Sequence, residues 1–204
     1  MEELEKKEEN REERAEKTAP GRQSPLLMLA FTALFAALTA VGAFIRIPTP
    51  WLAFTMQLLF VLMAGLLLGP LYGALSQLVY LLLGLIGLPI FTFGGCFSGI
   101  FQPSFGFLLG FIPAAAVTGA IARNSRNILR AFLACLAGLL MTYLVGIPYM
   151  WLILNYYIKA SYSFGALLMA YMLPYLPFDA LKIAIVLLSF QPLRSVIDKT
   201  LGRA

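Results

Sequence analysis

The residues best suited to binding chemistry are an acid and a base three positions apart, Asp179 and Lys182. This spacing places both side chains on one face of a helix, and the pair follows Pro174 and Pro177, which break or begin helices. Asp179 is the only acid between residues 17 and 197. Because a buried carboxylate is a strong acceptor for N–H groups, the pair predicts a ligand site. A self-satisfied ion pair, or an N-cap role for Asp179, is the alternative.

The rest of the sequence argues against catalysis. The chain has no histidine, which removes histidine-based catalysis and most metal sites. It has no phosphate-binding G-x-x-x-x-G-K-[ST] loop, no nucleophile–base pair and no paired carboxylates. Cys96 and Cys135 are expected on opposite sides of a membrane, so neither a disulfide nor a metal site is expected. We predict no catalytic residue, no cofactor and no ATP hydrolysis by this chain, and a membrane enzyme is a minor alternative.

The elements that position the pair follow from composition. Of 204 residues, 60% are apolar and 12% are charged, whereas a soluble domain is about 45–50% apolar and about 25% charged. The chain is therefore expected to be an integral membrane protein, and helices are the default because open sheets leave polar edges in lipid. The prediction is an all-α bundle of six transmembrane helices, some slightly shorter than the usual span of about 20 residues. The segments are 26–45, 52–69, 71–88, 105–122, 128–154 and 166–192.

Charge divides the chain into three parts. Residues 1–24 hold eight of the ten acids and have no apolar face, which predicts a disordered cytoplasmic tail. Residues 25–194 are the expected transmembrane substrate-binding domain, and 195–204 a short basic cytoplasmic tail. The formal charge of +5 is not a nucleic-acid footprint, because most of the charged residues lie at the ends of the chain and around the connection that holds Arg123 and Arg126.

Orientation follows from the basic residues. Arg123, Arg126 and Arg130 cluster around the connection between the fourth and fifth spans, whereas the opposite set of loops holds only Arg46 and Lys159. Cytoplasmic loops carry the excess of Lys and Arg. Both termini are therefore expected in the cytoplasm.

The loop 89–104 is long, uncharged and rich in glycine and aromatic residues. Irregular backbone at membrane depth must be buried or line a cavity, so the loop is expected to fold back and cover a site. Gln57, Gln77 and Gln102 are the other strongly polar residues in or near the spans. Each could contact a ligand, although glutamine in a membrane often links helices instead.

The first span carries a stripe of small residues at spacings of three and four. Such a stripe lets another helix approach closely. The neighbour could be a helix of this chain or a different protein. The stripe is Ala30, Ala33, Ala37 and Ala40.

Several stretches together resemble one family. They are Thr55-Met56-Gln57 followed by LLFVLMAGLLLGPLYGALSQLVYLLLGLIGLP, then FGGCFSGIFQPSFGFLLGF, YLVGIPYMWLI and LPFDALK. In order and spacing they resemble BioY, the biotin-specific substrate-binding (S) components of energy-coupling factor (ECF) transporters. The resemblance runs from about residue 28 to 192. One departure is that the family's Pro-Gly-Asp reads Pro177-Phe178-Asp179 here, and the glycine-rich loop lacks the Arg found in some relatives.

The resemblance implies a function and partners. A BioY protein takes up biotin as a six-helix protein of the cell membrane, here expected to be the bacterial cytoplasmic membrane. Its partners are a transmembrane coupling subunit and two ATP-binding subunits. The first helix docks on the coupling subunit through small residues, which matches the alanine stripe. An S component for another vitamin, or an assembly subunit without a small ligand, is the alternative.

Biotin suits the candidate residues. Asp179 could accept the ureido N–H groups, and Lys182 could pair with the biotin carboxylate or donate to the ureido carbonyl. If both hold the ureido head, the carboxylate tail needs another partner, for which Arg46 or Gln102 is suited. The aromatic residues that could cover the sulfur ring are Phe93, Phe97 and Tyr149.

Overall fold

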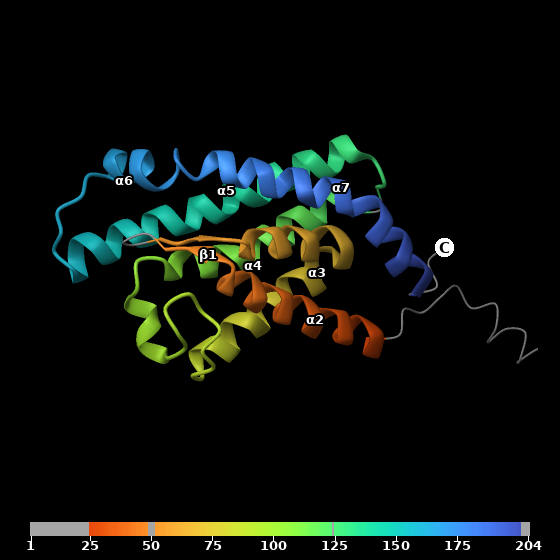
Figure 1. The fold of residues 1–204 in the computed structure, drawn as a ribbon, viewed down its shortest axis with the longest axis horizontal. Coiled ribbons are helices and arrows are strands. Elements are labelled where there is room, and N and C mark those ends of the chain that lie inside the picture. Colours follow the sequence, from red (N-terminus) through yellow and green to blue (C-terminus); the bar gives the residue numbers. More distant parts are fainter. Residues whose placement is uncertain (1–24, 49–51, 124, 201–204) are drawn as a thin grey trace, which may run out of the picture.

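The computed structural model describes residues 25–48, 52–123 and 125–200. The predicted tail at 1–24 and the last four residues of the predicted basic tail lie outside this part of the chain. Ten elements follow one another (Figure 1). They are α2 (Pro25–Phe44), β1 (Arg46–Ile47), β2 (Phe54–Thr55), α3 (Gln57–Leu85), the 3-10 helix η1 (Phe97–Phe101), α4 (Phe105–Ala122), α5 (Ile128–Leu152), the π-helix η2 (Ile153–Tyr157), α6 (Phe164–Tyr171) and α7 (Leu176–Thr200).

Among the described residues, five helices are long and apolar enough to cross a membrane, with α3 counted once. However, α3 is a hairpin of two helices. Its backbone turns at Gly69, where φ is 84°, and Pro70 follows. The Gln57 side chain donates a hydrogen bond of 2.8 Å to the Tyr80 hydroxyl. A straight helix would hold these two residues about 35 Å apart. The two apolar segments predicted on either side of this turn therefore exist and lie antiparallel.

The last predicted span, 166–192, is wrong as a single helix. It is divided between α6, which ends at Tyr171, and α7, which begins at Leu176. Pro174 lies in the break, because proline lacks a backbone N–H and disfavours helical backbone in the residue before it. The break places Asp179 in the first turn of α7.

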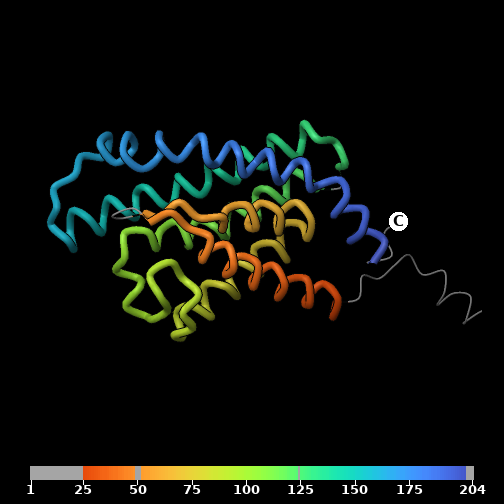
Figure 2. The backbone as a smooth tube through the Cα atoms, viewed as in Figure 1, coloured from red at the N-terminus to blue at the C-terminus, as the bar shows by residue number. Residues whose placement is uncertain are grey.

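Packing centres on α4. This helix lies between α3 and α5, while α2 packs against α3, and α7 contacts both α3 and α5 (Figure 2). The interior is filled mainly by leucine, phenylalanine and alanine. At Gly119 of α4, a Cβ atom would come within 2.5 Å of the backbone of Gly69 and Pro70. A glycine is therefore needed for α4 to reach the turn of the α3 hairpin.

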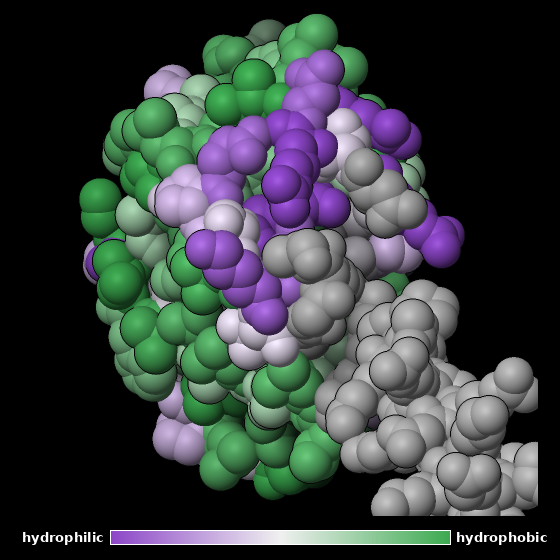
Figure 3. Space-filling view, turned by 90° about the vertical axis from the view of Figure 1, so that its right-hand side faces the viewer, coloured by the Kyte–Doolittle hydropathy of each residue, from purple (hydrophilic) through white to green (hydrophobic). Residues whose placement is uncertain are grey.

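The two ends of the bundle differ in chemistry. The first residues of α2 and the last residues of α7 lie at one end, and β1, α6 and the loop before α4 lie at the other (Figure 1). Hydrophilic side chains gather at the first end, over the α4–α5 connection and the end of α7 (Figure 3). Exposed basic residues here include Arg126, Arg130 and Lys199. The fold therefore separates a charged end from an end made of loops and aromatic residues.

Candidate functional site

Asp179 and Lys182 form a buried ion pair. Their exposed fractions are 3% and 7%, and Lys182 Nζ lies 2.7 Å from Asp179 Oδ1. The other carboxylate oxygen, Oδ2, accepts a 2.6 Å hydrogen bond from the hydroxyl of Tyr143 on α5. Both oxygens are thus engaged, and a group from another helix fixes the orientation of the carboxylate. Buried ions persist when paired and hydrogen-bonded in this way.

The ion pair lies in the wall of a pocket. The pocket spans about 590 Å³ of space between atoms, open solvent at its entrance included. Asp179 and Lys182 are the only charged residues among those that line it. The remaining wall is largely apolar and includes Phe93, Phe107 and Phe111. A largely apolar chamber with one ion pair in its wall suits a ligand that has a polar head and an apolar body.

The loop between α3 and α4 contributes to the pocket wall. Thr92, Phe93 and Ser104 contribute to the pocket lining, which confirms that this loop folds back over a cavity. Two hydrogen bonds from helices fix it. Tyr80 of α3 donates to the backbone oxygen of Ile90 over 3.0 Å, and Tyr149 of α5 donates to that of Ile100. The loop is therefore tied to helices on both sides of the pocket.

The connection between α2 and α3 also contributes to the pocket wall. Leu52 and Thr55 line the pocket. Phe54 stacks on Tyr175 with ring centroids 3.8 Å apart, and the Tyr175 hydroxyl donates to the Leu52 backbone oxygen. Since Tyr175 immediately precedes α7, the helix that carries the ion pair also holds this part of the wall in place.

Of the other predicted ligand residues, two line the pocket beside the ion pair. They are Gln57 and Phe93. Gln57 is buried, and its amide donates to Tyr80. Gln77 does not line the pocket; it links α3 to Thr39 of α2 by a 3.3 Å hydrogen bond, the helix-linking role expected of a membrane glutamine.

Four predicted residues lie outside the lining of this pocket. Tyr149 instead holds the loop before α4, as described above. Phe97 is 70% exposed, and Gln102 is exposed at the end of η1. Arg46 is exposed in β1, where it pairs with Thr55 of β2. Because Thr55 lines the pocket, Arg46 is the strand neighbour of a lining residue.

The sequence alone did not assign Tyr143 or Tyr175 to the binding site. Tyr143 touches Asp179 across 36 positions of sequence, and Tyr175 reaches Leu52 across 123. A weak signal existed for Tyr143. A tyrosine in the middle of an apolar span has a hydroxyl that needs a partner, and Asp179 was the only acid predicted at membrane depth.

The alanine stripe of α2 faces away from the bundle. Ala30, Ala33 and Ala37 are exposed, and Ala40 is partly buried. Contacts between α2 and α3 instead involve the opposite face, which includes the buried Phe35. The stripe is thus open for another helix rather than used within the described part of the chain.

Comparison with known proteins gives concordant matches. A model of the BioY family matches residues 14–199. A probable biotin transporter BioY of Lysinibacillus sphaericus is 47% identical over 146 residues, which are 70% of this chain and 74% of the relative. The biotin transporter BioY of Thermotoga maritima is 35% identical over 159 residues, which are 76% of this chain and 88% of the relative.

A solved structure has the same fold. It is the crystal structure of the S-component for biotin from an ECF-type ABC transporter, with a TM-score of 0.74 and 24% sequence identity. The match covers 85% of this chain and 94% of that one. Together with the family model, which spans most of the chain, these findings establish that the chain belongs to the BioY family.

Proposed function

We propose that this chain binds biotin and serves as the S component of an ECF transporter that takes up biotin across the bacterial cytoplasmic membrane. The observation that carries the proposal is the buried Asp179–Lys182 pair, oriented by Tyr143, in the wall of a largely apolar pocket. The names of the relatives and of the structural neighbour point to the same ligand.

The ion pair suits the ureido head of biotin. Lys182 points toward Asp179 rather than away from it, so both side chains act at the same end of the ligand. The Asp179 carboxylate would accept ureido N–H bonds, which are strong because the acceptor is charged. Lys182 would donate to the ureido carbonyl. Phe93 and Phe107 in the wall would pack against the sulfur ring.

The carboxylate of biotin then points toward the mouth. Arg46 is the favoured partner because its strand neighbour, Thr55, already lines the pocket. Gln102, at the far end of the loop before α4, is the second choice. Phe97 belongs to this loop, and Tyr149 holds the loop by a hydrogen bond. Both would affect ligand binding through the position of the loop.

The exposed alanine face of α2 is the proposed contact with the transmembrane coupling subunit. A surface of small side chains allows close helix approach in a membrane. Two ATP-binding subunits would hydrolyse ATP, since this chain has no phosphate-binding loop. The charged end of the bundle (Figure 3) supports cytoplasmic termini, because basic residues favour the cytoplasmic side.

Calorimetric titration of biotin tests the ligand and the site together. Wild type and Asp179→Asn are compared in detergent, with thiamine and riboflavin as control ligands. Removing the charge of the acceptor should weaken biotin binding by about 100-fold. The matched control is Asp198→Asn, which removes the other acid of the described residues at the opposite end of the bundle and should leave the affinity unchanged.

Each other outcome has a definite meaning. Wild-type affinity in Asp179→Asn would remove Asp179 from the site. If the folded wild type bound thiamine or riboflavin instead of biotin, the chain would be an S component for another vitamin. If it bound none of the three, the biotin assignment would be wrong, and the next ligands to test would be other vitamins.

A further inference from the structure

A second cavity lies at the charged end of the bundle, far along the chain's long axis from the ion pair. It holds about 1490 Å³ of empty space, its open mouth included. Three arginines and one acid line it, together with the turn of the α3 hairpin. The charged residues are Arg123, Arg126, Arg194 and Asp198.

The charges in this groove do not balance. Arg126 lies 3.0 Å and Arg194 3.7 Å from the same oxygen of Asp198. Asp198 is 6% exposed, and apart from Asp179 it is the only acid among the described residues. Arg123 has no ion pair within the described part of the chain. Three positive charges and one negative charge leave a net charge of +2, so the groove attracts anions.

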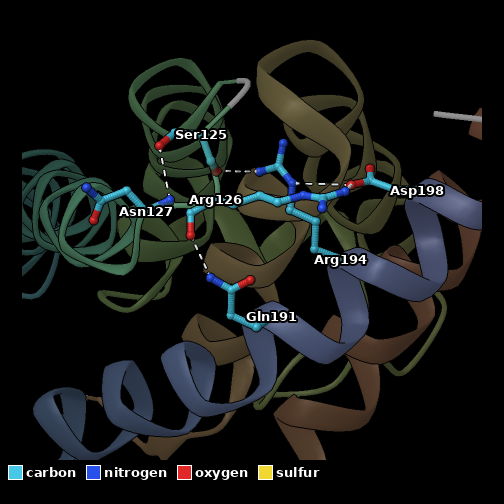
Figure 4. Close-up of polar contacts among 6 residues, drawn as sticks. All are labelled: Ser125, Arg126, Asn127, Gln191, Arg194 and Asp198. Carbon is cyan, nitrogen blue, oxygen red and sulfur yellow. Dashed lines mark hydrogen bonds and ion pairs between the residues drawn. The ribbon is translucent and has the colours of Figure 1, made fainter. Parts of the chain in front are cut away.

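Hydrogen bonds hold the Arg194 guanidinium and the backbone at Arg126 in place. Arg194 also donates to the Ser125 backbone oxygen over 3.0 Å, and the Gln191 side chain donates to the Arg126 backbone oxygen over 2.5 Å. Figure 4 shows these contacts drawing the α4–α5 connection and the end of α7 together around Asp198. Guanidinium groups that are already oriented lose less freedom when they bind an anion.

The other wall of the groove is apolar. It is formed by the leucines that flank the α3 turn, Leu66, Leu67, Leu68 and Leu71. Leu71 is 71% exposed although it lies beside arginines. Free phosphate has no apolar part to contact such a wall, whereas a phospholipid presents a phosphate next to an apolar chain. The groove lies at one end of a bundle of membrane-spanning helices, and this is the level at which lipid head groups are found.

We infer that this groove binds the head-group phosphate of an anionic phospholipid. Arginine forms paired hydrogen bonds with phosphate oxygens, and basic pockets between helices recognise anionic head groups. Arg123 supplies the uncompensated charge, Arg126 and Arg194 supply oriented donors, and the leucines contact the beginning of the acyl chains. This inference concerns a different surface from the proposed biotin site, and its outcome does not depend on that function.

The test measures lipid retention by the full chain. Detergent-purified protein is titrated with phosphatidylglycerol or with phosphatidylcholine of the same acyl chains, and bound lipid is counted by native mass spectrometry. The variant Arg123→Gln should bind phosphatidylglycerol about fivefold more weakly, the factor expected for one basic side chain at a lipid surface. Arg123→Gln together with Arg126→Gln should lower retention further. Circular dichroism and thermal unfolding check that each variant is folded.

The matched control is Arg130→Gln. Arg130 carries the same charge near the same connection, donates to the Ile121 backbone oxygen and does not line the groove. Its loss should leave lipid retention unchanged. Equal losses in Arg130→Gln and Arg123→Gln would overturn the inference, because they would reveal diffuse attraction rather than a site.

Two further arms need only the wild type. Equal retention of phosphatidylcholine and phosphatidylglycerol would overturn the inference, since the site would then ignore charge. Complete displacement of phosphatidylglycerol by millimolar inorganic phosphate would assign the groove to a free anion instead.

If Arg123→Gln lost the coupling subunit on co-purification but retained lipid normally, the groove would be a protein contact and the lipid assignment would be wrong.

Discussion

At the scale of single residues, Tyr143 connects α5 to the carboxylate of Asp179 through a 2.6 Å hydrogen bond. We expect Tyr143→Phe to weaken biotin binding about tenfold, because a buried carboxylate loses one of its donors and its fixed orientation. Titration of biotin into the purified variant measures this. Tyr156→Phe is the control, since Tyr156 is exposed and outside the pocket. Unchanged affinity in Tyr143→Phe would mean that the hydroxyl plays no part in binding.

Cys96 offers a second residue-scale prediction. Its thiol is exposed and lies 2.8 Å from the Ser98 hydroxyl, and the hydrogen bond from Ser98 lowers the pKa of the Cys96 thiol below its ordinary value. A lower pKa means more thiolate at neutral pH, so alkylation should reach its maximal rate at a lower pH than for a free cysteine.

The same thiol tests orientation. A membrane-impermeant maleimide added to intact cells should label Cys96, and Cys96→Ser should abolish the signal because Cys135 is buried. Labelling that requires disrupted cells would place this loop, and with it the mouth of the pocket, on the cytoplasmic side.

The predictability of the site differed from residue to residue. Asp179 and Lys182 could be selected because an ionisable pair within an apolar span is costly and therefore has a purpose. Tyr143 and Tyr175 could not, because the sequence contains other tyrosines in similar surroundings and the contacts of these two depend on how α5 and α7 pack. Arg46 and Gln102 were chosen for their chemistry alone, and in the structure neither lines the pocket.

At the scale of elements, the loop before α4 packs on α3 through the ring of Phe91, in addition to the hydrogen bond from Tyr80. A Cβ atom on Gly84 would lie 2.0 Å from the ring of Phe91, which is buried and packs against Tyr80 and Phe93. Gly84→Ala should displace Phe91, and with it Phe93 in the pocket wall. We expect a loss of roughly 1–3 kcal/mol in stability and weaker biotin binding, measured by thermal unfolding in detergent and by titration.

Gly165→Ala provides the matched control on α6. No heavy atom lies within 4 Å of its added Cβ, and alanine favours helix over glycine. Stability and biotin affinity should therefore be maintained or rise slightly. If Gly84→Ala also left stability and biotin affinity unchanged or slightly raised, the position of the loop would not depend on the contact between Phe91 and Gly84.

The elements themselves were predictable to different degrees. Long apolar runs and the Gly69–Pro70 turn are enough to identify the helices and the fold-back of α3. The break at Pro174 follows from proline chemistry. The prediction of one span over 166–192 did not allow for this break, because the apolar run is long enough to cross the membrane. The β1–β2 pair and the π-helix after α5 were not foreseen. Tyr175, which is distant in sequence, stacks on Phe54 of β2 and donates to Leu52 beside it, and local propensity does not contain that information.

At the scale of the whole molecule, ligand binding and partner docking occupy separate surfaces. Ala33→Trp and Ala37→Trp place bulk on the exposed face of α2, where it would prevent close approach of another helix. Co-purification of the coupling subunit should be lost, while the affinity for biotin remains that of the wild type. Ala120→Trp, at an exposed position of α4, is the control and should leave the complex intact. Retention of the complex in both α2 variants would place docking elsewhere.

The α3 hairpin also has a consequence for biosynthesis. Its two halves, 57–68 and 70–85 on either side of the turn, are each shorter than the roughly 17–25 residues that define an independent membrane span. Neither half is long enough to be inserted and retained alone as the chain leaves the ribosome. The two are therefore expected to enter the bilayer together, and only after residue 85 has emerged can this part of the protein commit to the membrane.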